Sequence, residues 1–106
     1  MPTKVKKALI VTGGSRGIGA ATSIKAAQMG YSVCVNYAKN SEQAENVVRQ
    51  IHAQGGKAIA VQADISSAVE VERLFMVVDG ELGELGGLVN NAGISGARAK
   101  LLDLDI

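Results

Sequence analysis

The chain has 106 residues, 47% of them hydrophobic and 20% charged, which is the composition of one soluble globular domain spanning residues 1–106. Eleven basic against ten acidic residues give a net charge of +1, so no long-range electrostatic field favours nucleic acid or an anionic membrane surface as a partner. No stretch approaches the ~20 apolar residues that cross a bilayer, none resembles a signal peptide, and the single cysteine, Cys34, cannot form an internal disulfide, all of which fits the reducing cytoplasm.

The first half of the sequence predicts two strands, each followed by a helix. Residues 8–12 are a short, mostly apolar run, which is typical of a strand buried on both faces, and residues 18–29 follow as a helix that Gly30 ends. Residues 32–36 repeat the apolar run as a second strand. Residues 40–54 then have the apolar spacing of an amphipathic helix, with a capping box at the start and a pair of glycines after the end.

A third strand and a third helix are predicted next. Residues 57–63 form another mostly apolar run and predict the strand. Ser67 and Glu70 have the spacing of a capping box, in which each side chain bonds the backbone of the other residue. The box predicts the start of a helix that continues through Val78 and ends near residues 80–83.

The fourth strand is predicted at residues 87–90 and is followed by a loop at residues 91–93. The tail, residues 94–106, has no strong period and predicts no final element. Strands that alternate with helices of this length imply a parallel sheet with right-handed crossovers. We therefore expect an α/β fold: a partial, Rossmann-like doubly wound parallel sheet with strand order 3-2-1-4 and helices on both faces.

The glycine-rich segment T-G-G-S-R-G-I-G, residues 12–19, lies between the first predicted strand and the first predicted helix. Backbone N–H groups and the helix dipole create an anion site at that position, and a diphosphate would fit it. Gly13, Gly17 and Gly19 permit a tight turn and a close approach of backbone to pyrophosphate. No Lys-Ser or Lys-Thr pair follows, which argues against a P-loop triphosphatase. The segment alone is also compatible with a plain turn between a strand and a helix.

The same spacing, preceded by Thr12, resembles the T-G-x-x-x-G-x-G motif of the short-chain dehydrogenase/reductase family. Two further segments resemble that family: N-N-A-G at residues 90–93, and Asp64-Ile65 after the third strand, at the family's adenine-contacting position. The three motifs occur in the family's order and spacing, and the resemblance covers essentially the whole chain. It implies a nicotinamide dinucleotide as cofactor and an oxidoreductase as the parent protein.

The resemblance also implies a role for each matching residue. The cofactor phosphates would lie against Gly13, Ser15, Arg16, Gly17, Ile18 and Gly19. The adenine would contact Asp64 and Ile65, and the ribose and nicotinamide side would be lined by Asn91, Ala92 and Gly93. For Asn90 the resemblance leaves a second role open, in which its side chain ties neighbouring strands together.

The choice between NADP(H) and NAD(H) is expected at the end of the second strand. In NAD-binding folds an acidic residue ~20 positions after the glycine turn accepts hydrogen bonds from the free ribose 2′-hydroxyl. Here that position falls near Asn36, which carries no charge to repel a 2′-phosphate, and Arg16 can pair with one. Lys39 either assists or is a solvated surface charge, and Tyr37 lies along the adenine or covers the sheet edge. We expect NADP(H), with NAD(H) as the weaker alternative.

The catalytic residues of the family, a Ser and a Tyr-x-x-x-Lys pair, have no counterpart in this sequence. The residue four positions after Tyr31 is Val35, and the residue four positions after Tyr37 is Ser41. The single histidine, His52, lies on a predicted helix, where a solvated or packing role is expected. We therefore assign no catalytic residue and no metal site.

Two functional classes remain open. The first is an oxidoreductase, a homo-oligomer when complete, that transfers hydride between NADP(H) and a small-molecule carbonyl or alcohol, with this chain supplying the cofactor-binding half. The alternative is a truncated, non-catalytic dinucleotide-binding or interaction module. We favour the first, because a dinucleotide fold needs two mononucleotide halves. For the chain by itself we expect no activity, and association through an unpaired strand edge at residues 88–90.

Overall fold

The computed structural model describes residues 7–15, 17–91 and 100–103. Strands and helices alternate along the chain up to the last pair, where one strand follows another, and the predicted elements are found within a few residues of their expected bounds. The elements are β1 Ala8–Thr12, α1 Gly17–Gln28, β2 Ser32–Tyr37, α2 Ser41–Ala53, β3 Lys57–Gln62, α3 Ala68–Glu81, β4 Leu85–Asn90 and β5 Lys100–Asp103.

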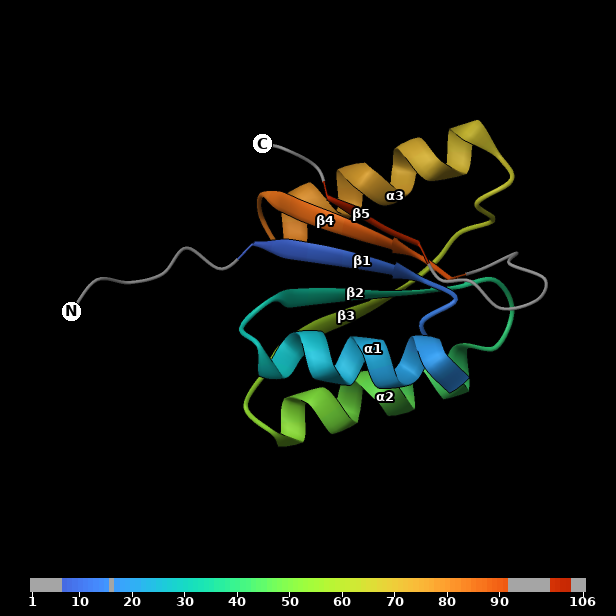
Figure 1. Ribbon diagram of the computed structural model, residues 1–106. Coiled ribbons are helices and arrows are strands. Elements are labelled where there is room, and N and C mark those ends of the chain that lie inside the picture. The colour runs from blue at the N-terminus through green and yellow to red at the C-terminus, as the bar shows by residue number, and fades with distance from the viewer. Residues whose placement is uncertain (1–6, 16, 92–99, 104–106) are drawn as a thin grey trace.

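The strands form one sheet in the order β3-β2-β1-β4-β5. β1 lies between β2 and β4 and pairs with both in parallel, and β2 pairs in parallel with β3 (Figure 1). All residues of β1 are buried, as expected of an apolar strand in a parallel sheet that is covered on both faces. The predicted order 3-2-1-4 is therefore confirmed.

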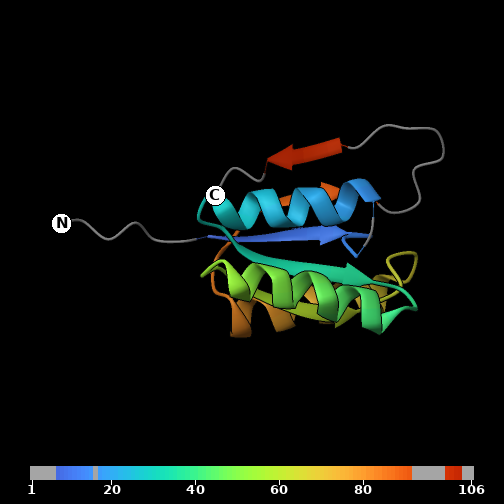
Figure 2. The ribbon, with the colours of Figure 1, turned by 90° about the horizontal axis from the view of Figure 1, so that it is seen from below.

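The prediction that the tail holds no further element, and that the edge of β4 is unpaired, was wrong. β5 pairs with β4 in antiparallel register, with Val89 opposite Leu101 and Asn90 opposite Lys100 (Figure 2). The antiparallel direction follows from the short connection, because a parallel crossover needs roughly a dozen residues or more. A strand as short as Lys100–Asp103 also has too few residues to produce a recognisable period, so only its pairing partner defines it.

The two faces of the sheet are covered by different helices, as predicted (Figures 1 and 2). Alternate β1 residues divide between them: Leu9 and Val11 pack with α1 and α2, while Ala8 and Ile10 pack with α3. Cys34 lies in the cluster on the α3 side, and burial raises the pKa of its thiol to about 12. It is therefore a packing residue, as expected of a thiol in an apolar run.

One bond of each predicted capping box forms, and the return bond does not: Gln43 Oε1 has no partner among the described residues, and Glu70 Oε1 accepts from the backbone N–H of Asp64 instead. The side chain of Asn40 accepts a hydrogen bond from the backbone N–H of Gln43 at the start of α2, and Ser67 accepts from the backbone N–H of Glu70 at the start of α3. Gly30 follows α1 with φ of 103°, a conformation that glycine adopts without strain. None of the helices in the described part of the chain is long and apolar enough to cross a membrane.

Candidate functional site

The loops after β1, β2, β3 and β4 meet along one edge of the sheet. These four strands are mutually parallel, so their carboxyl ends point the same way (Figure 1). The chain runs outward from β1 through β2 to β3 and then crosses to β4 on the other side of β1. The space beyond the ends of β1 and β4 is thus the topological switch point of the sheet, where open α/β folds bind ligands.

The glycines of the turn between β1 and α1 are needed for two different reasons. Gly13 and Gly17 have φ of 61° and 58°, in the left-handed region that other residues enter at a cost. Gly14 and Gly19 are needed for space: a Cβ at Gly14 would lie 2.8 Å from the Val11 carbonyl oxygen, and a Cβ at Gly19 would overlap the Gly13 carbonyl. Together the glycines allow a tight turn whose backbone a ligand can approach closely at the N-terminus of α1, as a diphosphate requires.

Ser23, on the buried face of α1, contacts the glycine turn from the interior of the protein. Its side chain is fully buried, and its Oγ donates to the Gly19 carbonyl oxygen at 2.9 Å and lies 3.4 Å from the Gly14 carbonyl oxygen, the alternative acceptor for the same proton. Neither Ser23 nor Gly14 was among the residues predicted from the sequence. A small polar residue on the buried face of a helix, four positions after a glycine, is the only signal that pointed to it.

The loop after β4 is tied to the glycine turn through Asn91. The backbone N–H of Asn91 donates to Thr12 Oγ1 at 2.8 Å, and its side-chain Nδ2 donates to the Gly13 carbonyl oxygen at 3.2 Å. Thr12 Oγ1 is also 3.2 Å from Asn90 Oδ1, which agrees with the strand-tying role left open for Asn90. Arg16, Ala92 and Gly93, which we expected at the same site, lie outside the described residues.

Asn36 is placed differently from the expectation that it faces the ribose. It is only 2% exposed, and its Nδ2 donates to the carbonyl oxygens of Val61 and Ala63, each at 3.2 Å. Its backbone carbonyl accepts from the N–H of Gly14 at 3.0 Å. The asparagine amide therefore links β2 to β3 and does not face the site. The residues that do border the site in this part of the chain come after Asn36.

Those residues border a pocket of about 280 Å³ at the end of β2. One buried acceptor there, Oε1 of Gln43, has no hydrogen-bond partner among the described residues. A buried acceptor without a donor is costly, and a ribose hydroxyl is a donor of suitable size. Tyr37 lines the pocket and is half-buried. The residues that line the pocket are Ser15, Tyr37, Ala38, Lys39, Asn40 and Gln43.

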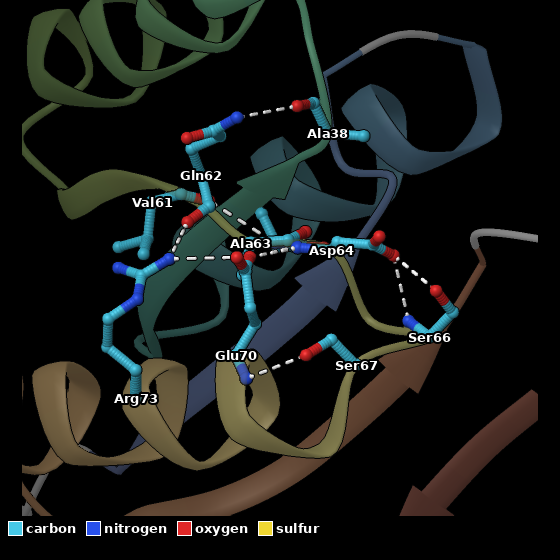
Figure 3. Close-up of polar contacts among 10 residues, drawn as sticks. Ala38, Val61, Gln62, Ala63, Asp64, Ser66, Ser67, Glu70 and Arg73 are labelled. Carbon is cyan, nitrogen blue, oxygen red and sulfur yellow. Dashed lines mark hydrogen bonds and ion pairs between the residues drawn. The ribbon is translucent and has the colours of Figure 1, made fainter.

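Asp64 lies in the loop after β3 and is exposed (Figure 3). Its Oδ1 accepts hydrogen bonds from the side chain of Ser66 at 2.7 Å and from the backbone N–H of Ser66 at 3.0 Å. These bonds, the side-chain bond first, lower the pKa of the Asp64 carboxyl. Ile65 is half-buried and borders a small cavity of about 170 Å³ between α3 and the ends of β1 and β4.

The structure thus brings most of the expected residues to one edge of the sheet. Gly13, Ser15, Gly17 and Gly19 form the turn at the N-terminus of α1, where no acidic residue lies in the first turn of the helix to oppose an anion. Ile18 lies on the same turn and is exposed. A glycine-rich turn, a helix N-terminus and a flanking pocket with an acceptor that has no partner among the described residues together fit a dinucleotide.

These features define a doubly wound fold of the dinucleotide-binding class. The sequence matches the family described as short chain dehydrogenase over residues 7–105. The chain therefore belongs to the short-chain dehydrogenase/reductase family of oxidoreductases, and the resemblance of its three motifs to that family is confirmed.

Individual relatives agree with this assignment. The chain is 46% identical over 92 residues to the 3-oxoacyl-[acyl-carrier-protein] reductase FabG of Staphylococcus aureus strain Mu50, an alignment that covers 87% of this chain and 37% of the relative. It is 51% identical over 85 residues to the oxidoreductase YgfF of Escherichia coli K12, covering 80% and 34% of the two chains. The chain thus spans little more than a third of the length of these relatives.

Solved structures give the same result. A dehydrogenase/reductase from Sinorhizobium meliloti 1021 superposes with a TM-score of 0.80 at 43% identity, covering 83% of this chain and 35% of the other. The reductase LugOII, described as catalysing keto-reduction in lugdunomycin biosynthesis, superposes with a TM-score of 0.75 at 42% identity, covering 85% and 39%.

Proposed function

We propose that this chain supplies the NADP(H)-binding half of an oxidoreductase that moves hydride between the nicotinamide ring and a carbonyl or alcohol. The observation that carries the proposal is the joint between the glycine turn and the loop after β4, in which Asn91 bonds Gly13. This hydrogen bond holds the segment after β4 beside the turn after β1, at the switch point of the sheet. A dinucleotide bound there would extend from its phosphates toward its nicotinamide.

Each part of the site has its own task in this proposal. The glycine turn and Ser15 bind the diphosphate, Asp64 and Ile65 contact the adenine, and the loop that starts at Asn91 lines the nicotinamide side. The cofactor, when bound, accepts or donates hydride. The residues assigned here bind and orient it, and the general acid and base are supplied from outside this set.

The preference for NADP(H) is supported by the pocket at the end of β2. None of its lining residues is acidic, and one, Lys39, is basic and exposed. An acidic side chain would accept a hydrogen bond from the free 2′-hydroxyl of NAD(H) and would repel the 2′-phosphate of NADP(H). A lysine side chain attracts that phosphate. Arg16 supports the same preference from the sequence.

The relatives and the surface support further parts of the proposal. The activity for which FabG is named makes a 3-oxoacyl thioester the first carbonyl substrate to test. We place the complete protein in the cytoplasm as a homo-oligomer. Exposed apolar side chains on α3, of which Val69 is 75% exposed and Met76 is 72% exposed, support association, because large apolar groups gathered on one surface favour contacts with a partner.

Calorimetric titration of the purified polypeptide with NADPH and with NADH tests the proposal. We expect NADPH to bind about tenfold or more tightly, because a charge-assisted hydrogen bond to the 2′-phosphate contributes roughly 1.5 to 3 kcal/mol. Equal affinities would contradict the NADP(H) assignment. Absence of binding by either nucleotide would favour the alternative, a non-catalytic interaction module.

A further inference from the structure

A series of polar contacts joins the loop after β2 to the loop after β3, on the outside of the proposed site (Figure 3). Gln62, at the end of β3, donates from Nε2 to the carbonyl oxygen of Ala38 at 3.0 Å. Arg73 on α3 donates from Nη2 to the carbonyl oxygen of Gln62 at 2.5 Å and lies 3.7 Å from Glu70 Oε1. Glu70 Oε1 in turn accepts from the backbone N–H of Asp64 at 2.7 Å.

The two ends of this series are the two loops that border the adenosine end of the site. Ala38 lines the pocket after β2. Asp64 lies in the loop that we assign to the adenine. Loops lack the regular hydrogen bonds of strands and are the more mobile parts of a fold, so side-chain contacts that hold them from outside decide how well they are preorganised.

We infer that Gln62 and Glu70 are positioning residues for the adenosine end of the cofactor. Neither lines the pocket at the end of β2, and each bonds a backbone group of a loop that borders the site. Binding is weakened when a loop must be ordered as the ligand arrives. The inference rests on the proposed function, because it assigns these residues to the same site.

The contacts are exposed, so their removal should change stability little and affinity more. Replacing the Glu70 side chain leaves the cap of α3 in place, because Ser67 accepts from the backbone N–H of Glu70 and not from its side chain. A loss of nucleotide affinity in such a variant therefore cannot be attributed to a lost helix cap.

The test compares two disruptive variants with two conservative or neutral ones. Gln62→Ala and Glu70→Ala should each weaken adenosine 2′,5′-bisphosphate and NADPH by about three- to tenfold, the effect of losing one hydrogen bond. Gln62→Glu should behave as Gln62→Ala, since a carboxylate cannot donate to the Ala38 carbonyl. Glu70→Gln should bind nearly as the unmodified protein does, because its amide oxygen still accepts from Asp64.

Matched controls separate positioning from a general loss of structure. Gln28→Ala removes another exposed glutamine hydrogen bond, from Gln28 Nε2 to Gln54 Oε1 at 3.1 Å, which joins the C-terminal ends of α1 and α2 and contacts neither loop. Glu72→Ala removes an exposed carboxylate from α3. Both should keep native affinity. Thermal melts should change by a similar, small amount in all the variants.

Amide hydrogen exchange gives a second readout that needs no ligand. Loss of the Glu70 side chain should speed exchange at the Asp64 amide, which is its hydrogen-bond donor, and Glu72→Ala should not. If the unmodified protein binds the nucleotides and Gln62→Ala and Glu70→Ala bind them with the same affinity, the inference is overturned and the proposed function stands. Failure of the unmodified protein to bind either nucleotide would overturn the proposed function and the inference with it.

Discussion

The side-chain nitrogen of Asn91 lies 3.2 Å from the carbonyl oxygen of Gly13 and donates to it, so the loop after β4 is fastened to the turn after β1. The same side chain would meet any Cβ added at Gly19, where Nδ2 would be 2.8 Å away. The Asn91 side chain therefore restrains the conformation of the glycine turn and also forms part of the surface beside it.

Asn91→Ala is expected to lower the free energy of unfolding by about 1 kcal/mol, the net value of one hydrogen bond, and to weaken NADPH severalfold. The reason is that the Gly13 carbonyl loses its donor and the turn loses a restraint. Chemical denaturation and calorimetry measure the two effects. Asn46→Ala, an exposed asparagine on α2, is the control and should change neither; equal behaviour of the two variants would contradict the structural role of Asn91.

Two glycines of the turn should respond differently to substitution. Gly19→Ala overlaps the Gly13 carbonyl and should lower the melting temperature strongly. Gly17→Ala meets no atom within 4 Å but keeps a φ of 58°, so its cost should be roughly 1 kcal/mol while nucleotide binding is lost.

The control for the glycine pair is Gly80→Ala on α3, where the added methyl group meets nothing within 4 Å and φ is unstrained. It should raise stability by about 0.5 to 1 kcal/mol. A Gly17→Ala protein that folds and binds NADPH with native affinity would show that the turn is not the phosphate site.

Asn36→Asp distinguishes the strand-tying role from a role in cofactor choice. A carboxylate at this buried position faces the carbonyl oxygens of Val61 and Ala63 with no proton to donate, so we expect a loss of about 3 kcal/mol or more in the free energy of unfolding. Asn46→Asp makes the same chemical change in solvent and should be nearly neutral. If the Asn36→Asp protein were stable and preferred NADH, residue 36 would contact the ribose of the cofactor, and the strand-linking role would be contradicted.

Asp64 gives a prediction on pH. Its hydrogen bonds to Ser66 lower the pKa of the carboxyl below the ordinary 3.8. A lowered pKa in the folded state means that the contribution to stability is present above pH ~4 and is lost as the pH falls through the lowered value. Ser66→Ala removes the side-chain bond and should move the NMR titration midpoint of Asp64 upward. An unchanged midpoint would contradict the assigned cause.

Much of the fold could be predicted because its signals are local. The apolar runs of β1, β2 and β3, the caps at Asn40 and Ser67, and Gly30 after α1 each depend on residues close together in sequence. Local patterns of this kind fix the type of an element and, through the alternation of strands and helices, the parallel sheet.

What could not be predicted depends on partners far away in the chain. β5 is defined by its pairing with β4, and the amide of Asn36 is directed by carbonyls on β3. Counting from the glycine turn located Asn36 in the sequence, but the count does not give the face on which a side chain lies. The contact of Gln62 with Ala38 likewise has no signal within either segment.

The most direct test of the account is to map NADPH binding by NMR on the isotopically labelled polypeptide. We expect the largest amide shifts at Gly13, Ser15, Gly17, Gly19, Tyr37, Asp64 and Asn91. A separate apolar groove of about 440 Å³, between α1 and β4 and bordered by Lys25, Met29 and Gly86, serves as the comparison. Shifts confined to that groove, with the glycine turn unmoved, would contradict the assignment of the turn as the cofactor site.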